Sequence, residues 1–466
     1  MTRSFRNILI FGLFIFITRI PFLFDGFGSE EDAWAMLLVA ERIGNTGIYE
    51  VSRLPGHPVQ ELIYSSFWSM GPIFFNLLTT IISTIGILAF VAMLIQLGVK
   101  NAYWCGAALA FTPVIYINSS NAMDYTWALG FILLSGYFIS KKNIILAAGM
   151  LALAVGCRIT SGAMLLPYLL LIWKFSDENH RIKKSFLFIA TTLLGSVIVM
   201  SPVIYQYGLE FFTYYQHFAI PGFLKNAYKG SIAVWGITGC LTIAFYFITI
   251  ILKKRILKEI YFENKNISKT LLVVCAISIT LYLIAFIKIP LKAAFMIPMC
   301  PFLILGLALF LDEKSIRNLV ISLLFSCFFL GINLADENRG SATSALAVRV
   351  MVGGNSIAID PTQGLVLADQ SKRKQQIKFA EKIINRTSVI RSKTILIAGW
   401  WNAIVQVFYK KNPNDSVIVR HYIDEPELKW LKRNGYEIYY VEDQGAYNDL
   451  RFKKNMTDQY AKQLDF

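Results

Sequence analysis

The chain has 466 residues, of which 55% are hydrophobic and only 16% are charged, and its formal net charge is +15. Soluble globular domains carry about 25% charged residues, so this composition excludes a soluble protein. It also excludes a single-span anchor, because many separate apolar runs approach the ~20 residues that cross a bilayer. We therefore interpret the chain as a polytopic α-helical membrane protein. Its basic excess then marks cytoplasmic loops and phosphate-handling sites rather than nucleic-acid binding.

Eleven apolar segments predict membrane spans. The first covers residues 7–24 and follows a short basic start. A signal peptide would need a small-x-small cleavage site close behind this run, and the only such tripeptide lies well past it, so we expect the span to be retained. The other ten spans are expected near residues 72–97, 102–118, 124–140, 143–156, 159–173, 185–206, 231–252, 269–288, 293–311 and 315–332.

Lysine and arginine residues indicate the orientation of these spans. The stretch 143–173 has Lys141 and Lys142 before it and Lys174 after it, so we divide it into a hairpin with Arg158 at its outer tip. With eleven spans, the inner segments hold 17 lysine and arginine residues and the outer loops hold 7. This imbalance predicts a cytoplasmic N-terminus and an extracytoplasmic C-terminus.

Two outer segments are long. Residues 25–71 form the first outer loop of a transmembrane domain, residues 1–332, and residues 333–466 form a C-terminal extracytoplasmic domain. The stretch 333–370 has glycine-rich turns and no clear period. The second half of this domain alternates between strand and helix patterns, which predicts a small α/β layer. The strands are expected at 394–398, 416–421 and 437–441, and the helices at 402–411 and 425–434.

Two outer segments carry carboxylates. The first outer loop opens with Glu30, Glu31 and Asp32, just before an amphipathic stretch at 33–43. Carboxylates at a membrane surface repel anionic head groups, which favours a functional role for them. They also have a structural interpretation, because acidic residues stabilise the first turn of a helix. Asp124 lies where a later span begins. It either caps that helix or binds an acceptor and assists a base, and both interpretations stay open here.

Basic residues next to apolar runs suggest a phosphate site. Arg158 lies between two such runs. Placing an arginine at membrane depth costs free energy, so we first consider a functional role for it. At the outer surface it can also simply snorkel to lipid phosphate. Lys288 and Lys292 flank Pro290 in the same way. Together these cations would hold a lipid phosphate at the outer leaflet, arginine through two hydrogen bonds and lysine as a point charge.

These features together resemble the GT-C superfamily of integral-membrane glycosyltransferases, which includes the protein O-mannosyltransferases and the lipid A aminoarabinose transferases. The shared layout is a first span, a long outer loop that opens with an acid, a multispan body and an outer C-terminal domain. The matching residues form short patches at 30–34, 47–49, 53–58, 158–161, 166–167, 290–292 and 297–301.

The resemblance implies a sugar donor on a polyprenyl phosphate and a glycan, lipid or protein acceptor of the cell envelope. Asp32, with Glu31 as runner-up, would act on the acceptor hydroxyl in a single displacement that inverts the anomeric centre. A helix starting near Ala33 would turn Glu30 and Glu31 away from the site. The remaining candidates are substrate-binding side chains of the outer loops: Asp124, Arg158, Lys292, His57 and Arg53. Of these, Arg158 and Lys292 are the phosphate candidates.

We expect no cofactor, because neither a nucleotide-binding glycine loop nor a zinc-type histidine spacing occurs. Some GT-C relatives use a divalent metal at a DxD-like pair, and the run Glu30-Glu31-Asp32 is not one, which argues against metal dependence. The expected setting is a bacterial inner membrane. Two alternatives remain. A flippase or transporter of lipid-linked glycans would not need an outer acid, and a polymerase or ligase would join whole oligosaccharides.

Overall fold

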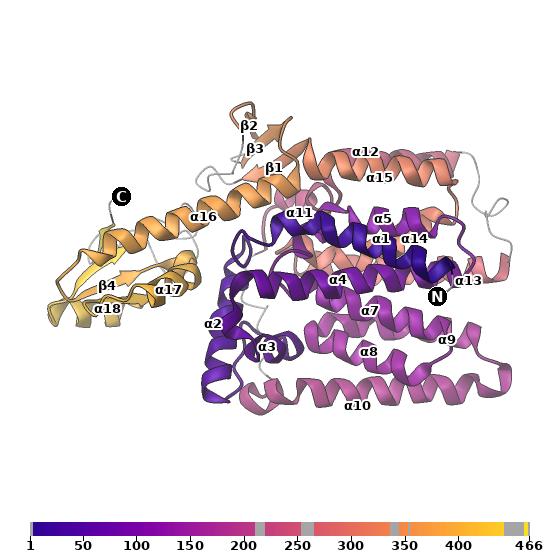
Figure 1. The fold of residues 1–466 in the computed structure, drawn as a ribbon, viewed down its shortest axis with the longest axis horizontal. Helices are drawn as coiled ribbons and strands as arrows, with labels where there is room; N and C mark the ends of the chain where they lie inside the picture. The colour runs from indigo at the N-terminus through magenta and orange to yellow at the C-terminus, as the bar shows by residue number, and fades with distance from the viewer. Residues whose placement is uncertain are drawn as a thin grey trace.

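The computed structural model describes residues 3–209, 220–252, 265–335, 344–352, 355–441 and 461–464. Long helices run side by side along one direction, and short helices of the first outer loop lie across one end of this bundle (Figure 1). The C-terminal strands and helices are attached at the same end. We call it the loop end of the bundle.

The bundle is built from apolar helices whose direction alternates along the chain (Figure 1). α4 packs against α7, and α8 lies between α7 and α10. Gly86 and Gly130 allow the first contact, since a Cβ atom on Gly86 would lie 2.5 Å from the Cα of Gly130. The bundle helices are α1 (Arg3–Arg19), α4 (Gly71–Gln96), α5 (Ala102–Ala110), α6 (Pro113–Asn118), α7 (Tyr125–Ser140), α8 (Ile144–Cys157), α9 (Leu165–Phe175), α10 (Arg181–Tyr207), α12 (Ile232–Leu252), α13 (Lys265–Lys288), α14 (Cys300–Ala308) and α15 (Glu313–Phe328).

Helix lies within every one of the predicted spans. By length and composition, four described helical segments suffice to cross a membrane: Trp68–Gln96, Glu178–Tyr207, Ile232–Leu252 and Ile267–Lys288. Shorter apolar helices occupy Tyr125–Ser140, Ile144–Cys157, Ile159–Phe175 and Ala293–Ala308. The chain is therefore a helical membrane protein, and the count of eleven spans stays a prediction.

The predicted span at 102–118 is divided in two. α5 ends at Ala110 and α6 begins at Pro113, which has no backbone N–H with which to continue the preceding helix. Similar short 3₁₀ segments, η3 (Ile159–Met164) and η7 (Ala293–Met299), precede α9 and α14. Arg158 directly precedes η3, and Lys292 directly precedes η7.

The first outer loop contains α2 (Glu31–Thr46), α3 (Pro58–Ser65) and the short turn η2 (Trp68–Met70). α2 lies across the ends of the bundle helices (Figure 1). One face of α2 is buried at helical spacing, and it ends at Gly47, whose φ of 68° is the left-handed conformation that glycine adopts at a helix end. The buried residues are Ala33, Trp34, Met36, Leu38, Val39, Ala40 and Ile43.

Two sheets follow the bundle. α15 leads into an antiparallel sheet of order β1-β3-β2. Its strands are β1 (Gly331–Ala335), β2 (Val348–Val352) and β3 (Asn355–Asp360). The long helix α16 (Leu365–Ser388) then leads to a parallel sheet of order β5-β4-β6-β7. This antiparallel sheet and α16 were not predicted.

The predicted α/β alternation after residue 394 is confirmed. The strands are β4 (Thr394–Ile397), β5 (Val417–Arg420), β6 (Glu437–Tyr440) and β7 (Lys462–Gln463), joined through α17 (Asn402–Lys411) and α18 (Glu425–Arg433). α17 packs on α2, where Trp34 and Phe408 have ring centroids 6.0 Å apart. The C-terminal segment thus contacts the first outer loop directly, and a domain boundary at 332 stays a prediction.

A further short helix, α11 (Phe223–Gly230), lies before α12.

Candidate functional site

Charged side chains from four separate segments meet at the loop end of the bundle. We call this group the charge cluster, and it contains Glu30, Asp32, Arg53, Asp124, Arg158 and Lys292. The first three come from the first outer loop, and the others come from the start of α7, the end of α8 and the turn before η7. Apart from Glu30, all were predicted site residues, and the fold brings them together.

Asp124 lies at the centre of the cluster with 0% of its side chain exposed. Arg53 Nη2 donates to its Oδ1, Arg158 Nη1 donates to its Oδ2 at 2.6 Å, and His57 Nδ1 lies 3.6 Å from Oδ2. Two arginine hydrogen bonds compensate the burial of this carboxylate, so Asp124 is ionised. Its side chain makes no capping hydrogen bond to the described start of α7, so simple helix capping does not explain it.

Arg53 links Asp124 to Asp32. Its Nη1 lies 3.2 Å from Asp32 Oδ2, and Lys292 Nζ donates to the same Asp32 oxygen. Asp32 stands in the first turn of α2 with 27% of its side chain exposed. Burial would raise the pKa of Asp32, but Arg53 and Lys292 outweigh it and hold the pKa well below the ordinary value. In this state Asp32 is a paired anion and a weak base.

Lys292 also donates to Glu30 Oε2, so it bridges two carboxylates. Burial would lower its pKa, whereas Asp32 and Glu30 together raise the pKa well above its ordinary value. The expectation that Glu30 turns away from the site is wrong. Glu30 precedes α2 and has extended backbone, with φ −108° and ψ 145°, so the helical periodicity does not set its direction.

Glu31 is outside the charge cluster. Its Oε1 lies 3.5 Å from Nε2 of His421, the residue after β5 in the C-terminal sheet. Asp32 and Glu31 are adjacent in the first turn of α2, so their side chains point about 100° apart around the helix axis. Of the two candidates for the base, Asp32 is the one that lies among the cations.

His57 packs beside Asp124 and is almost fully buried. Its Nδ1 lies 2.6 Å from the carbonyl oxygen of Cys157, and because a carbonyl only accepts hydrogen bonds, Nδ1 carries the proton. Its Nε2 has no hydrogen-bond partner among the described residues. Burial, with a smaller effect of Arg53 and Arg158, lowers the pKa of His57 although Asp124 opposes this. The imidazole is therefore neutral at pH 7.

Arg158 is held on two aromatic rings. Its Cζ lies 4.4 Å from the ring centroid of Tyr125 and 4.9 Å from that of Phe295. Only 11% of its side chain is exposed. The alternative that Arg158 merely snorkels into the head-group region is therefore wrong, because its guanidinium points to buried Asp124.

Glu61 holds the loop that carries Arg53 and His57. Its buried carboxylate accepts hydrogen bonds from the Tyr49 hydroxyl at 2.5 Å, from both the backbone N–H and the hydroxyl of Ser52 at 2.7 Å, and from the backbone N–H of His57 at 3.0 Å. We did not predict this role. The signal was a carboxylate between the apolar residues Val59 and Leu62 of α3, because a buried carboxylate needs partners.

α16 fixes the cluster from the other side. Asp369 accepts from the Ser29 hydroxyl at 2.5 Å, and Gln376 donates to the carbonyl oxygen of Ser29 at 3.1 Å. Arg373 donates to the carbonyl oxygen of Ser120 at 2.9 Å. The start of the first outer loop and the segment before Asp124 are therefore both tied to one helix of the C-terminal region.

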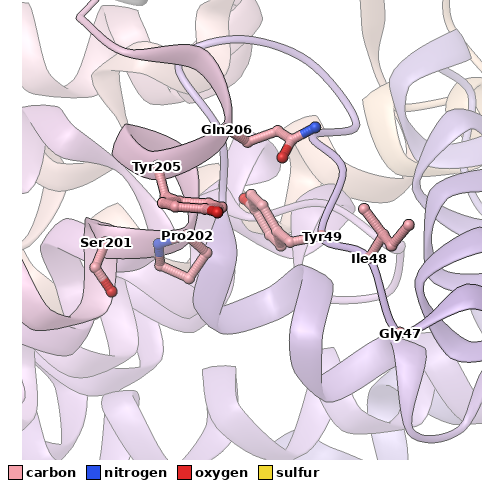
Figure 2. A pocket seen from close by; sticks show the side chains of 7 residues that line it. All are labelled: Gly47, Ile48, Tyr49, Ser201, Pro202, Tyr205 and Gln206. Atoms are coloured by element: carbon pink, nitrogen blue, oxygen red, sulfur yellow. The ribbon is translucent and has the colours of Figure 1, made fainter.

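A pocket of about 520 Å³ lies between the first outer loop and the end of α10 (Figure 2). Its lining side chains are uncharged, so it is separate in chemistry from the charge cluster. Figure 2 shows Tyr49 on one side and Tyr205 on the other. The lining residues are Gly47, Ile48, Tyr49, Ser201, Pro202, Tyr205 and Gln206.

The carboxylates of the cluster are all paired with cations of the chain. Glu30, Asp32 and Asp124 each accept from an arginine or a lysine. No group of three or more His, Cys, Asp or Glu side chains gathers as a metal site in the described part of the chain. The cluster therefore holds three cations, Arg53, Arg158 and Lys292, each paired with at least one of its three carboxylates.

No family model and no curated protein matches the chain by sequence. Solved structures of ArnT from Cupriavidus metallidurans share its fold. The apo structure has a TM-score of 0.52 at 11% identity and covers 99% of this chain and 90% of ArnT. The structure with undecaprenyl phosphate has a TM-score of 0.53 at 11% identity and covers 92% of each chain. The chain is thus a membrane protein with the fold of ArnT, a lipid A aminoarabinose transferase of the GT-C glycosyltransferases.

Proposed function

We propose that this protein transfers a sugar from a polyprenyl-phosphate donor to a glycan, lipid or protein acceptor of the envelope, on the extracytoplasmic side of a bacterial inner membrane. The observation that carries the proposal is the charge cluster at the loop end of an ArnT-like fold. The binding of undecaprenyl phosphate by ArnT supports the lipid class of the donor.

Lys292 is the cation that a donor phosphate meets first. It is 29% exposed, whereas Arg53 and Arg158 are each 11% exposed. Both arginines are engaged by fully buried Asp124, while Lys292 pairs with two partly exposed carboxylates. A phosphate oxygen therefore competes with Glu30 and Asp32 for Lys292, and the Asp124 pairs remain as a fixed support.

When the phosphate replaces Asp32 as the partner of Lys292, Asp32 becomes able to act as the base. While Asp32 is paired, its pKa stays well below the ordinary value and proton abstraction is unfavourable. A phosphate bound to Lys292 adds negative charge beside Asp32 and draws Lys292 away from it. Both effects raise the pKa of Asp32. The acceptor oxygen then attacks the anomeric carbon, its proton passes to Asp32, and the bond from that carbon to the phosphate oxygen breaks. The lipid phosphate leaves with the electron pair, stabilised by Lys292 and Arg53, and the anomeric centre inverts.

The test is Asp32→Asn, which keeps size and polarity and removes basicity. Transfer from a polyprenyl-phosphate sugar in membranes should fall by roughly 10²–10⁴. Binding of undecaprenyl phosphate should be retained or strengthened, because Lys292 loses a competing carboxylate. Glu31→Gln is the matched control, since Glu31 is the neighbouring acid and pairs with His421 of the C-terminal sheet.

The outcomes separate the alternatives. Near-normal transfer by Asp32→Asn removes the base assignment, and an inactive Glu31→Gln with active Asp32→Asn moves that role to Glu31. A flippase needs no base, so unimpaired movement of lipid-linked sugar across vesicles by Asp32→Asn, with no transfer by either protein, would establish the transporter alternative. Transfer of whole oligosaccharides but not of single sugars would establish a polymerase or ligase.

A further inference from the structure

Tyr125 has a buried hydroxyl that the described structure leaves without a hydrogen-bond partner. The residue follows Asp124 at the start of α7 and is 1% exposed. Nearly all buried polar groups in native proteins are paired, and an exception needs an explanation such as a role in binding. Tyr125 lies against the charge cluster, so its unused hydroxyl is placed where a ligand is expected.

The ring of Tyr125 is fixed in position. The Cζ atoms of Arg158 and Arg53 lie 4.4 Å and 5.9 Å from its centroid, and the Phe295 ring centroid lies 6.2 Å away. A side chain packed on this many sides cannot swing to find another partner. The position of its hydroxyl is therefore set before any ligand arrives.

Tyr125 is linked to the exchangeable cation through Arg53. The Arg53 guanidinium lies over the Tyr125 ring, and it shares the Oδ2 atom of Asp32 with Lys292. Lys292 is also paired with Glu30. When Lys292 leaves Glu30 for a phosphate, an O–H donor already stands next to the new anion.

We infer that the Tyr125 hydroxyl donates to a phosphate oxygen of the lipid donor, as the neutral partner of Lys292 in one phosphate-binding pair. This inference rests on the proposed function. A hydroxyl suits the second position, because it adds a hydrogen bond without a further charge. The lipid phosphate can then dissociate after transfer more easily than if a second cation held it in place of the hydroxyl.

The experiment compares two tyrosine-to-phenylalanine variants of the full chain in detergent. Tyr125→Phe removes an unpartnered hydroxyl. The matched control is Tyr168→Phe, which removes a buried hydroxyl that donates to the carbonyl oxygen of Ile132 at 2.7 Å. Each protein is titrated with radiolabelled undecaprenyl phosphate, and its thermal unfolding is recorded without ligand.

The two variants should change in opposite ways. Tyr125→Phe should bind undecaprenyl phosphate about tenfold or more weakly, as expected for a lost hydrogen bond to a charged group. Its midpoint of unfolding should equal or exceed that of the wild type, because no made bond is lost. Tyr168→Phe should unfold at a lower temperature and bind normally. Undecaprenol should bind Tyr125→Phe and wild type equally, and millimolar inorganic phosphate should not displace the lipid.

Equal affinity of wild type and Tyr125→Phe for undecaprenyl phosphate overturns the inference and leaves the proposed function standing. Parallel losses of affinity and stability in Tyr125→Phe also overturn it, since they mark a structural hydroxyl. If inorganic phosphate displaces the lipid, the pair is a free-phosphate site and the lipid assignment is wrong. If the wild type fails to bind undecaprenyl phosphate, both the proposed donor class and the inference about Tyr125 are wrong.

Discussion

Asp124→Asn tests the reasoning about the charge cluster most directly. Asp124 is fully buried between Arg53 and Arg158, each 11% exposed. In the wild type three carboxylates balance three cations, and the substitution leaves two carboxylates. Removing one partner of a buried ion pair typically costs about 3–5 kcal/mol. We expect the free energy of unfolding to fall by about that amount, toward the upper end because two arginines lose the same partner.

A double-mutant cycle shows whether charge balance is the cause. Arg158→Met leaves Asp124 paired with Arg53, so its cost should be smaller than that of Asp124→Asn. The double variant has two carboxylates and two cations and is balanced again. Its loss should be smaller than the sum of the single losses by about 0.5–3 kcal/mol. The assay is denaturant titration of the purified chain in detergent, followed by far-ultraviolet circular dichroism.

An additive cycle would refute this reasoning. So would an Asp124→Asn variant as stable as the wild type, since it would show that the arginines do not depend on that carboxylate. The control is Glu50→Gln, which removes the carboxylate of an exposed ion pair with Arg42. Its loss should be smaller than that of Asp124→Asn, because exposed ion pairs contribute only about 0–1 kcal/mol.

Two further predictions concern pH and orientation. Burial lowers the pKa of His57 in the folded chain, so below about pH 6.5 the unfolded chain binds a proton that the folded chain does not. The free energy of unfolding should fall from pH 7 to pH 5, and His57→Asn should lose part of that slope; an identical slope would contradict the buried neutral imidazole. For orientation, with the six free cysteines replaced, an impermeant thiol reagent on intact cells should label Ser388→Cys and spare Ser140→Cys, and the reverse result would overturn the predicted orientation.

Four members of the charge cluster could be named from the sequence because they stand where charged residues are unusual. Arg158 and Lys292 stand beside apolar runs, and Asp124 and Asp32 stand at helix starts near the membrane surface. Their pairing could not be predicted. Lys292 and Asp32 are 260 residues apart, and only the packing of the bundle brings the start of α2 next to the turn before η7.

α16 was missed for a related reason. Its buried face includes Val366, Ala380 and Ile383 at helical spacing, but Arg373 and Gln376 occupy positions in the same stripe. These two polar residues are buried because they donate to carbonyl oxygens of Ser120 and Ser29. A hydrophobic pattern interrupted by an arginine and a glutamine gives no clear period. The strand β2 was missed because all five of its residues are exposed, so it lacks the alternation of a half-buried strand.

The contacts between α16 and the first outer loop also set an order of events during synthesis. Ser29 and its partner Asp369 are 340 residues apart, and at typical elongation rates a ribosome needs about 20 to 70 s to cover that length. During this interval the loop carries Asp32 and Arg53 but lacks the helix that fixes its start. The charged residues of the loop are therefore synthesised before α16, the helix that holds the start of the loop. The site can adopt its final geometry only when the C-terminal third of the chain has been made. An incomplete chain can hold every residue of the cluster and still be unable to hold them in place.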